Sequence, residues 1–65
     1  MEKVKYMRIG NVLNSNNEII GTIDRMKFID NDRIYYDLNT RSVGRGFESI
    51  KELNEYLEKY GYRWV

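Results

Sequence analysis

The stretch Phe47–Gly61, FESIKELNEYLEKYG, predicts one helix with a defined beginning and a defined end. Ser49 and Glu52 have the spacing of a capping box, in which the serine side chain accepts a hydrogen bond from the glutamate N–H. Gly61 is placed where a left-handed C-cap residue is expected, because glycine has no Cβ to clash at positive φ. The helix is therefore expected between these two caps.

One face of this predicted helix is apolar. The residues that recur at helical spacing are Ile50, Leu53, Tyr56, Leu57 and Tyr60. Such a stripe is typical of a helix that packs on one side against a core. The opposite face carries lysine, glutamate and asparagine and is mildly acidic, so we expect the helix to act as scaffold.

The chain before the helix predicts strands separated by polar turns. In the first strand, Val4–Leu13, the apolar residues switch parity, which indicates a bulge near Arg8 or Gly10. The turns are Asn14–Asn17 and Asp30–Asp32, because asparagine and aspartate bond their own backbone and tolerate left-handed conformations. Two further strands are expected, one between these turns and one after the second.

The most regular of these strands is Arg33–Asn39, which alternates strictly between two sets of side chains. The set expected to face the helix is Ile34, Tyr36 and Leu38. Arg33 and Tyr35 are then expected to face solvent on the other side of the sheet.

The strand between the turns, Glu18–Ile29, is long enough to need an irregularity. Its apolar residues fall on two parities, so we predict a register change near Asp24-Arg25. After this change, Arg25 and Lys27 are expected to lie beside the two exposed residues of the following strand.

These elements predict a small two-layer α+β domain, with residues 1–65 as a single domain. Its fold is a three-stranded antiparallel β-meander packed on one C-terminal helix (β-β-β-α). Residues 62–65, YRWV, offer a short fourth strand at the C-terminus. Residues 40–46, with two glycines and two arginines, are expected to form a loop.

At the level of the fold, this arrangement is similar to the arm-binding domains of phage-type integrases and to AP2-like domains. The local likeness is the strand-to-helix junction Gly46–Leu57, GFESIKELNEYL. The resemblance implies a sheet that binds DNA.

The composition argues against an enzyme. The chain has no histidine and no cysteine, so the common general bases, nucleophiles and transition-metal ligands are missing. Asp30 and Asp32 resemble the start of a calcium loop, but the twelfth position is Arg41 rather than glutamate. We therefore predict no catalytic residue, no metal site, no cofactor and no small-molecule substrate.

Basic and aromatic residues supply the predicted partner-binding surface. The candidate residues are Arg25, Lys27, Arg33, Tyr35, Arg41, Arg45 and Trp64. Cations beside aromatic rings suit phosphate contact and base stacking, and they equally suit a protein interface. A plain solvated face is the third interpretation, because Asp24, Asp32 and Asp37 interleave with the cations. Trp64 either closes the edge of the core or docks on a partner, and we favour closure of the core.

A net charge of +1 and an abundance of aromatic residues favour a non-enzymatic protein-binding or regulatory module. The expected partner is an unidentified protein or a second copy in a homodimer. The alternative is a nucleic-acid-binding domain that binds DNA or RNA with the basic and aromatic face of the sheet. Asn, Ile, Lys and Tyr are common and have AT-rich codons, which suggests an AT-rich bacterium or its phages as the source. Small size, near-neutral charge and surplus aromatics suggest a phage or prophage accessory protein. MEKVKYMRIG has no apolar signal-peptide core, and no apolar run has transmembrane length, so we expect a cytoplasmic protein without a membrane partner.

Overall fold

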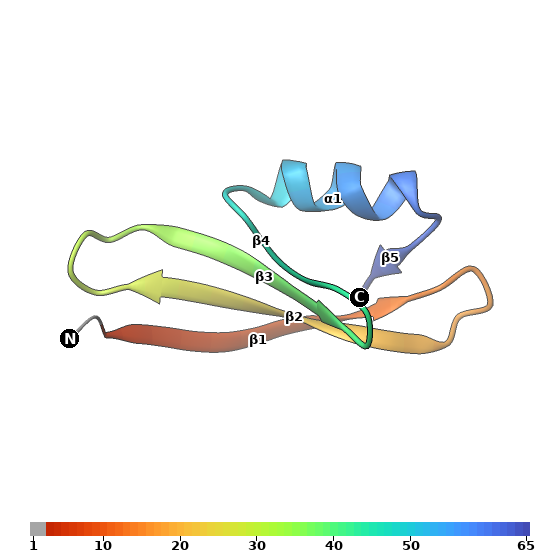
Figure 1. Cartoon of the computed structure of the whole chain (residues 1–65), viewed down its shortest axis with the longest axis horizontal. Helices are drawn as coiled ribbons and strands as arrows, with labels where there is room; N and C mark the ends of the chain where they lie inside the picture. The colour runs from red at the N-terminus through yellow and green to blue at the C-terminus, as the bar shows by residue number, and fades with distance from the viewer. Residues whose placement is uncertain (1–2) are drawn as a thin grey trace.

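The structure, a computed structural model, describes residues 3–65, and residues 1 and 2 of the predicted domain lie outside this range. Its elements are β1 (Val4–Leu13), β2 (Ile19–Phe28), β3 (Ile34–Thr40), β4 (Gly44–Phe47), α1 (Ile50–Lys59) and β5 (Arg63–Trp64). The strands form one antiparallel sheet in the order β4-β3-β2-β1-β5 (Figure 1). The chain is thus a small α+β domain, with five strands where the sequence predicts three or four.

The helix covers only one end of one face of the sheet (Figure 1). With 10 residues, α1 is about 15 Å long, whereas 10-residue strands such as β1 and β2 are about 33 Å long. The molecule is accordingly elongated, with extents of 40 × 19 × 18 Å. Beyond the helix, Val4–Arg8, Asp24–Phe28 and Arg33–Asp37 form a three-stranded part of the sheet that we call the uncovered end.

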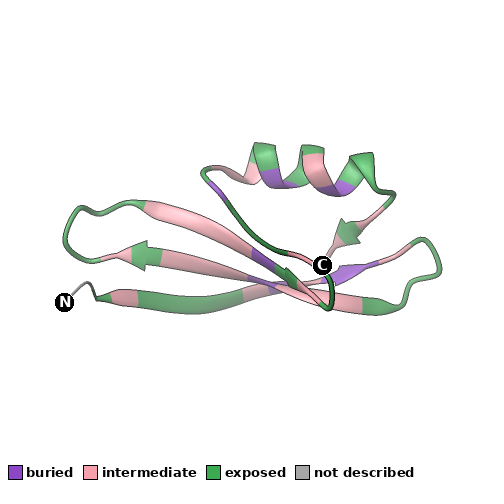
Figure 2. Cartoon of the chain, viewed as in Figure 1, coloured by how far each residue is buried: buried purple, intermediate pink, exposed green. Residues whose placement is uncertain are grey.

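The core lies at the covered end, between the helix and the sheet (Figure 2). The buried residues of this cluster are Val12, Ile23, Leu38, Phe47, Leu53 and Leu57. Leu53 and Leu57 are almost fully buried, which confirms the apolar stripe of the helix, although Tyr60 at its end is half exposed. The sheet-side partners include Leu38, as the alternation of the third strand predicts.

The helix ends follow the predicted caps with one difference. Ser49 Oγ accepts a hydrogen bond from the Glu52 backbone N–H at 3.1 Å. The Glu52 carboxylate accepts from the N–H of Glu48 at 3.3 Å rather than from that of Ser49. Gly61 has φ of 73°, which confirms it as the left-handed residue at the C-terminal end.

The predicted bulge in the first strand is confirmed, and the predicted register change in the second is wrong. The β1–β2 register shifts between Arg8 and Gly10, which leaves Ile9 as the extra residue. Pairing of β2 with β3, in contrast, continues without a break from Gly21 to Lys27. The bulge absorbs the change of parity in β1, so β2 keeps its alternation past Asp24-Arg25.

The predicted loop at residues 40–46 is also wrong, because part of it is strand β4. β4 pairs with β3, and the hairpin is closed by a hydrogen bond from Thr40 N–H to the Val43 carbonyl at 2.8 Å. Gly44 and Gly46 have low strand propensity, so this strand is held by its pairing and by the burial of Phe47. The short C-terminal strand is confirmed, since β5 pairs with β1 at Val12 and Leu13.

Candidate interaction surface

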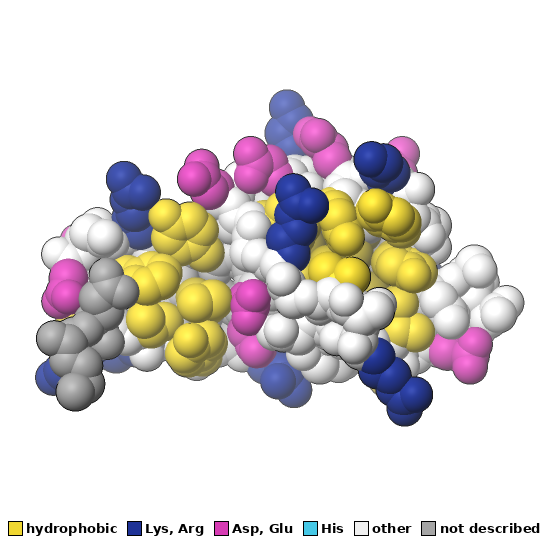
Figure 3. Space-filling view, viewed as in Figure 1, with side chains coloured by type: hydrophobic (Ala, Val, Ile, Leu, Met, Phe, Trp, Pro, Cys, Tyr) yellow, Lys and Arg dark blue, Asp and Glu magenta, His cyan; other side chains and the backbone are white. Residues whose placement is uncertain are grey.

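The side of the uncovered end that faces away from the helix carries a group of apolar side chains. We call this group the aromatic face; its residues are Val4, Tyr6, Met26, Phe28 and Tyr35. The strand registers place them side by side, because Val4 pairs with Phe28, and Met26 pairs with both Tyr6 and Tyr35. Tyr6 is 64% exposed. Figure 3 shows hydrophobic side chains gathered at this end of the molecule, separated by acidic groups from those near the helix.

The aromatic face has internal order. The Phe28 and Tyr35 rings meet edge to face, with centroids 5.5 Å apart, a favourable geometry for aromatic pairs. Arg33 Nη1 donates to the Tyr35 hydroxyl at 3.2 Å, and this bond raises the pKa of the guanidinium above its usual value. Arg33 lies at the outer margin of the face, where Glu48 lines the same hollow as Arg33 and Tyr35.

Charged side chains form the opposite margin of the aromatic face. Arg8 Nε and Asp24 Oδ1 make a salt bridge of 3.0 Å, the one ion pair within residues 3–65. Asp37 pairs in register with Asp24, and its Oδ2 accepts from the Asn39 side chain at 2.8 Å. The aromatic face thus has Arg33 at its outer margin. Its inner margin is the row of Arg8, Asp24 and Asp37, which has a net charge of −1.

The other side of the uncovered end is basic. In the registers, Lys5 is directly opposite Lys27, and Met7 is opposite Arg25. Lys5, Arg25 and Lys27 share this side with Ile34 and Tyr36, and no acidic residue within the described registers alternates onto it. We call these three cations the basic face. Like charges directly opposite each other on neighbouring strands repel, so a bound anion would relieve this pair.

The predicted grouping of Arg25 and Lys27 with Arg33 and Tyr35 is therefore wrong. Because β2 has no register change, Arg25 pairs with Tyr36 and Lys27 pairs with Ile34. These cations point to the helix side of the sheet, whereas the hydrogen-bonded Arg33 and Tyr35 lie on the far side. The structure divides the predicted patch between two opposite faces.

Two of the remaining predicted residues lie against the core. Trp64 packs on the buried cluster, and its Nε1 donates to Asn54 Oδ1 of the helix at 2.8 Å, as expected for closure of the core edge. The Arg45 guanidinium lies 5.3 Å from the Phe47 ring centroid and 5.1 Å from that of Tyr56. Both side chains are thus occupied by contacts within the chain.

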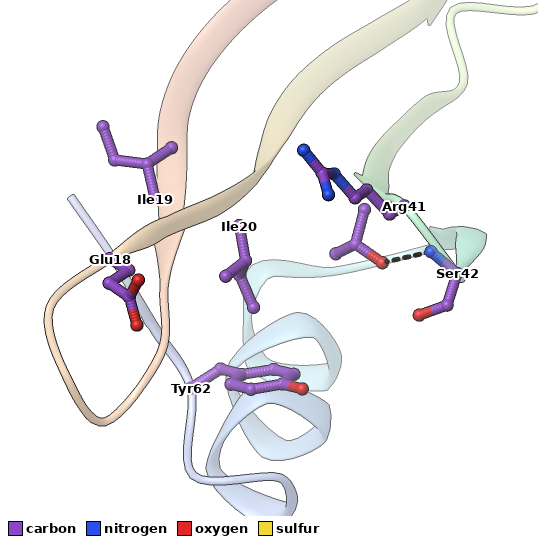
Figure 4. A pocket seen from close by; sticks show the side chains of 7 residues that line it. Glu18, Ile19, Ile20, Arg41, Ser42 and Tyr62 are labelled. Atoms are coloured by element: carbon purple, nitrogen blue, oxygen red, sulfur yellow. Dashed lines mark hydrogen bonds between the residues drawn. The ribbon is translucent and has the colours of Figure 1, made fainter.

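Arg41 lies at the other end of the molecule, on a hollow of about 430 Å³ below the β3–β4 turn. Glu18 and Arg41 approach this hollow from opposite sides, with Ile20 and Tyr62 between them (Figure 4). The turn itself is held by Ser42 N–H, which donates to Thr40 Oγ1 at 3.3 Å. Glu18, Arg41 and Tyr62 line the hollow together with the apolar Ile19 and Ile20.

The sequence-based candidates omit four residues of the aromatic face, Val4, Tyr6, Met26 and Phe28, and the basic residue Lys5. The pattern that could have identified them is the unbroken alternation from Ile23 to Phe28, with apolar residues at 26 and 28 and cations at 25 and 27. Without a register change, this alternation places Met26 and Phe28 on one face of the sheet and Arg25 and Lys27 on the other.

Comparison with protein-family models, curated proteins and solved structures gave no significant match. Within residues 3–65, no helix has the length and apolarity needed to cross a membrane. The same part of the chain contains no cluster of three acidic side chains that could hold a metal ion.

Proposed function

We propose that this chain is a non-enzymatic protein-interaction module that binds its partner through the aromatic face. The observation that supports this proposal is the position of five apolar side chains on a half-sheet that the helix does not reach. Apolar groups gathered on a surface with a charged margin are typical of protein interfaces, in which tyrosine, phenylalanine, methionine and arginine are enriched. Arg33, Tyr35 and the apolar residues around them match that composition.

Tyr6 is the side chain of this face that has most to gain from a partner. It is 64% exposed on β1, which pairs with β2 on one side at residues 4–8. On its other side, β1 pairs with β5 only at Val12 and Leu13 within the described residues. A rigid aromatic ring in such a position is a common anchor in protein interfaces. We therefore assign it the centre of the contact.

A photoreactive phenylalanine analogue in place of Tyr6 tests the proposal in cells that make the protein. We expect ultraviolet light to yield covalent adducts with protein, because the aromatic ring at this position would be buried against the partner. The matched control carries the same analogue at Lys51, which is exposed on α1. Adducts from neither position, or the same adducts from both, would contradict the proposal.

We propose nucleic-acid binding by the basic face as the second candidate function. The observation that favours it is specific: Lys5, Arg25 and Lys27 share one side of the sheet, and none of the residues paired with them in the strand registers is acidic. Phosphate contacts by lysine and arginine release counterions and give salt-dependent affinity. This candidate uses a different side of the sheet from the aromatic face.

A salt titration of binding to generic duplex DNA tests this second candidate. Three phosphate contacts predict a slope of about −2.7 for log K against log salt. We expect Lys5→Gln or Lys27→Gln to reduce the slope by about one, whereas Lys51→Gln on the helix leaves it unchanged. No binding at low salt would exclude phosphate recognition by this face.

A further inference from the structure

We infer that the partner of the aromatic face is a second copy of this chain, in a symmetric homodimer with the two faces packed against each other. This inference rests on the proposed function, because it names the occupant of the same surface. The argument for a second copy comes from the charges at the margins of the face.

The exposed side of the uncovered end consists of three cross-strand rows. The outer row contains Val4, Phe28 and Arg33, since the Phe28 N–H donates to the Arg33 carbonyl at 2.9 Å. The middle row contains Tyr6, Met26 and Tyr35, and the inner row contains Arg8, Asp24 and Asp37. The outer row therefore carries one net positive charge and the inner row one net negative charge. The middle row has no charge of its own and ends beside Glu48, which lies near Arg33 and Tyr35 at the β4 edge. The surface is complementary to itself after a half-turn about the middle row.

A two-fold axis that lies between the sheets and runs along the middle row places the outer row of each copy over the inner row of the other. Strands of the two copies then run antiparallel, and β3 lies over β3. Arg33 of one copy is brought to Asp37 of the other, and the symmetry makes this contact twice. Arg33 and Asp37 lie on opposite sides of Tyr35, each two residues or about 6.6 Å away, so both contacts form in one register.

An axis along the strands is less favourable, because it would stack the outer row on the outer row and the inner row on the inner row. This axis would place β1 of one copy over β3 of the other, with Asp24 over Asp24 and Arg33 over the apolar Val4. Asp37 would lie over Arg8, whose guanidinium already pairs with Asp24 of its own chain. The charge pattern therefore selects the axis across the strands. Two sheets packed in this way keep their strands within about 30° of each other.

The size of the surface sets the expected strength of the dimer. The exposed side of the uncovered end spans three strands about 4.8 Å apart and five residues, or about 16 Å, along each strand. This footprint is smaller than the surface of about 800 Å² per partner that stable interfaces bury, so we expect a weak dimer in exchange with the monomer.

Sedimentation of the intact chain over concentrations from about 1 µM to about 1 mM is the direct test. We expect the mass to rise from 7.9 kDa towards twice that value. Arg33→Asp and Asp37→Lys are each expected to weaken the dimer by about tenfold or more, because each places like charges together at both symmetric contacts. Lys51→Asp on the helix is the control that changes charge without changing the dimer. Far-UV circular dichroism verifies that each variant is folded.

An equimolar mixture of the two variants gives the decisive result. In a mixed dimer, the two substituted side chains meet at one contact as an aspartate and a lysine, and the unchanged Asp37 meets the unchanged Arg33 at the other. We therefore expect the mixture to dimerise more strongly than either variant does alone. A wild-type chain that stays monomeric at the highest concentration, or a mixture that stays monomeric, overturns the inference. If Tyr6 still cross-links to a different protein in that case, the proposed function survives without the second copy; if it cross-links to nothing, both are wrong.

Discussion

Leu53→Ala is expected to lower the free energy of unfolding by about 2–5 kcal/mol, the range for removing a buried leucine side chain. Leu53 is 0% exposed and lies at the centre of the contact between α1 and the sheet. A domain of 65 residues has a total stability of roughly 3–10 kcal/mol, so this loss is a large fraction of it. We expect a substantial unfolded population at room temperature.

Urea unfolding followed by far-UV circular dichroism measures this loss. Glu55→Ala is the matched control, because Glu55 is an exposed residue of the same helix and its removal should change the stability by less than about 0.5 kcal/mol. Equal effects at the two positions would show that the buried face of the helix is misassigned.

Gly21→Ala is expected to destabilise the sheet by about 1–3 kcal/mol through overpacking. A Cβ at this position would overlap the Asn39 carbonyl oxygen and lie 2.8 Å from Thr40 Cγ2. Both neighbours belong to β3, which is held in register with β2, so neither can move without disturbing the pairing. The clash involves backbone, and a change of side-chain rotamer cannot relieve it.

Gly46→Ala provides the comparison, because a Cβ at Gly46 would meet no atom within 4 Å and the residue has no positive φ. We expect Gly46→Ala to be neutral or to stabilise by about 0.4–1 kcal/mol, since alanine restricts the unfolded chain. Thermal unfolding distinguishes the two variants, at about 4–8 °C per kcal/mol for a domain of this size. A Gly21→Ala midpoint equal to that of Gly46→Ala would contradict the close approach of β2 and β3.

Local patterns predicted the parts of the fold that depend on neighbours in sequence. The capped helix follows from Ser49 and Gly61, and the bulge follows from the parity switch near Arg8. Strand β4 was not predicted, because Gly44 and Gly46 weaken any local preference and the strand is defined by its pairing with β3. Pairing with a distant segment is not visible in a short window of sequence.

The two faces of the uncovered end were not predicted for a different reason. The prediction assumed that Met26 and Phe28 must turn towards a core, and a register change was needed to achieve this. A helix of about 15 Å cannot cover strands of about 33 Å, so apolar residues near the strand ends have no core to enter. A comparison of helix and strand lengths would have indicated that Arg25 and Lys27 lie on one face of the sheet and Tyr35 on the other.

Because the helix is shorter than the strands, the local stability of the chain differs along its long axis: it is high at the covered end, where the core lies, and low at the uncovered end. Separating the strands near Asp30–Asp32 would disrupt few buried contacts, whereas separating them near Val12 would dismantle the core. Segments with few buried contacts open locally at low free energy, while core segments open only when the whole domain unfolds. The partner that we propose for the uncovered end would therefore add its binding free energy to the part of the fold that is weakest alone. With such a partner bound, recognition and folding would be coupled, and its occupancy would set how long the β2–β3 hairpin stays closed.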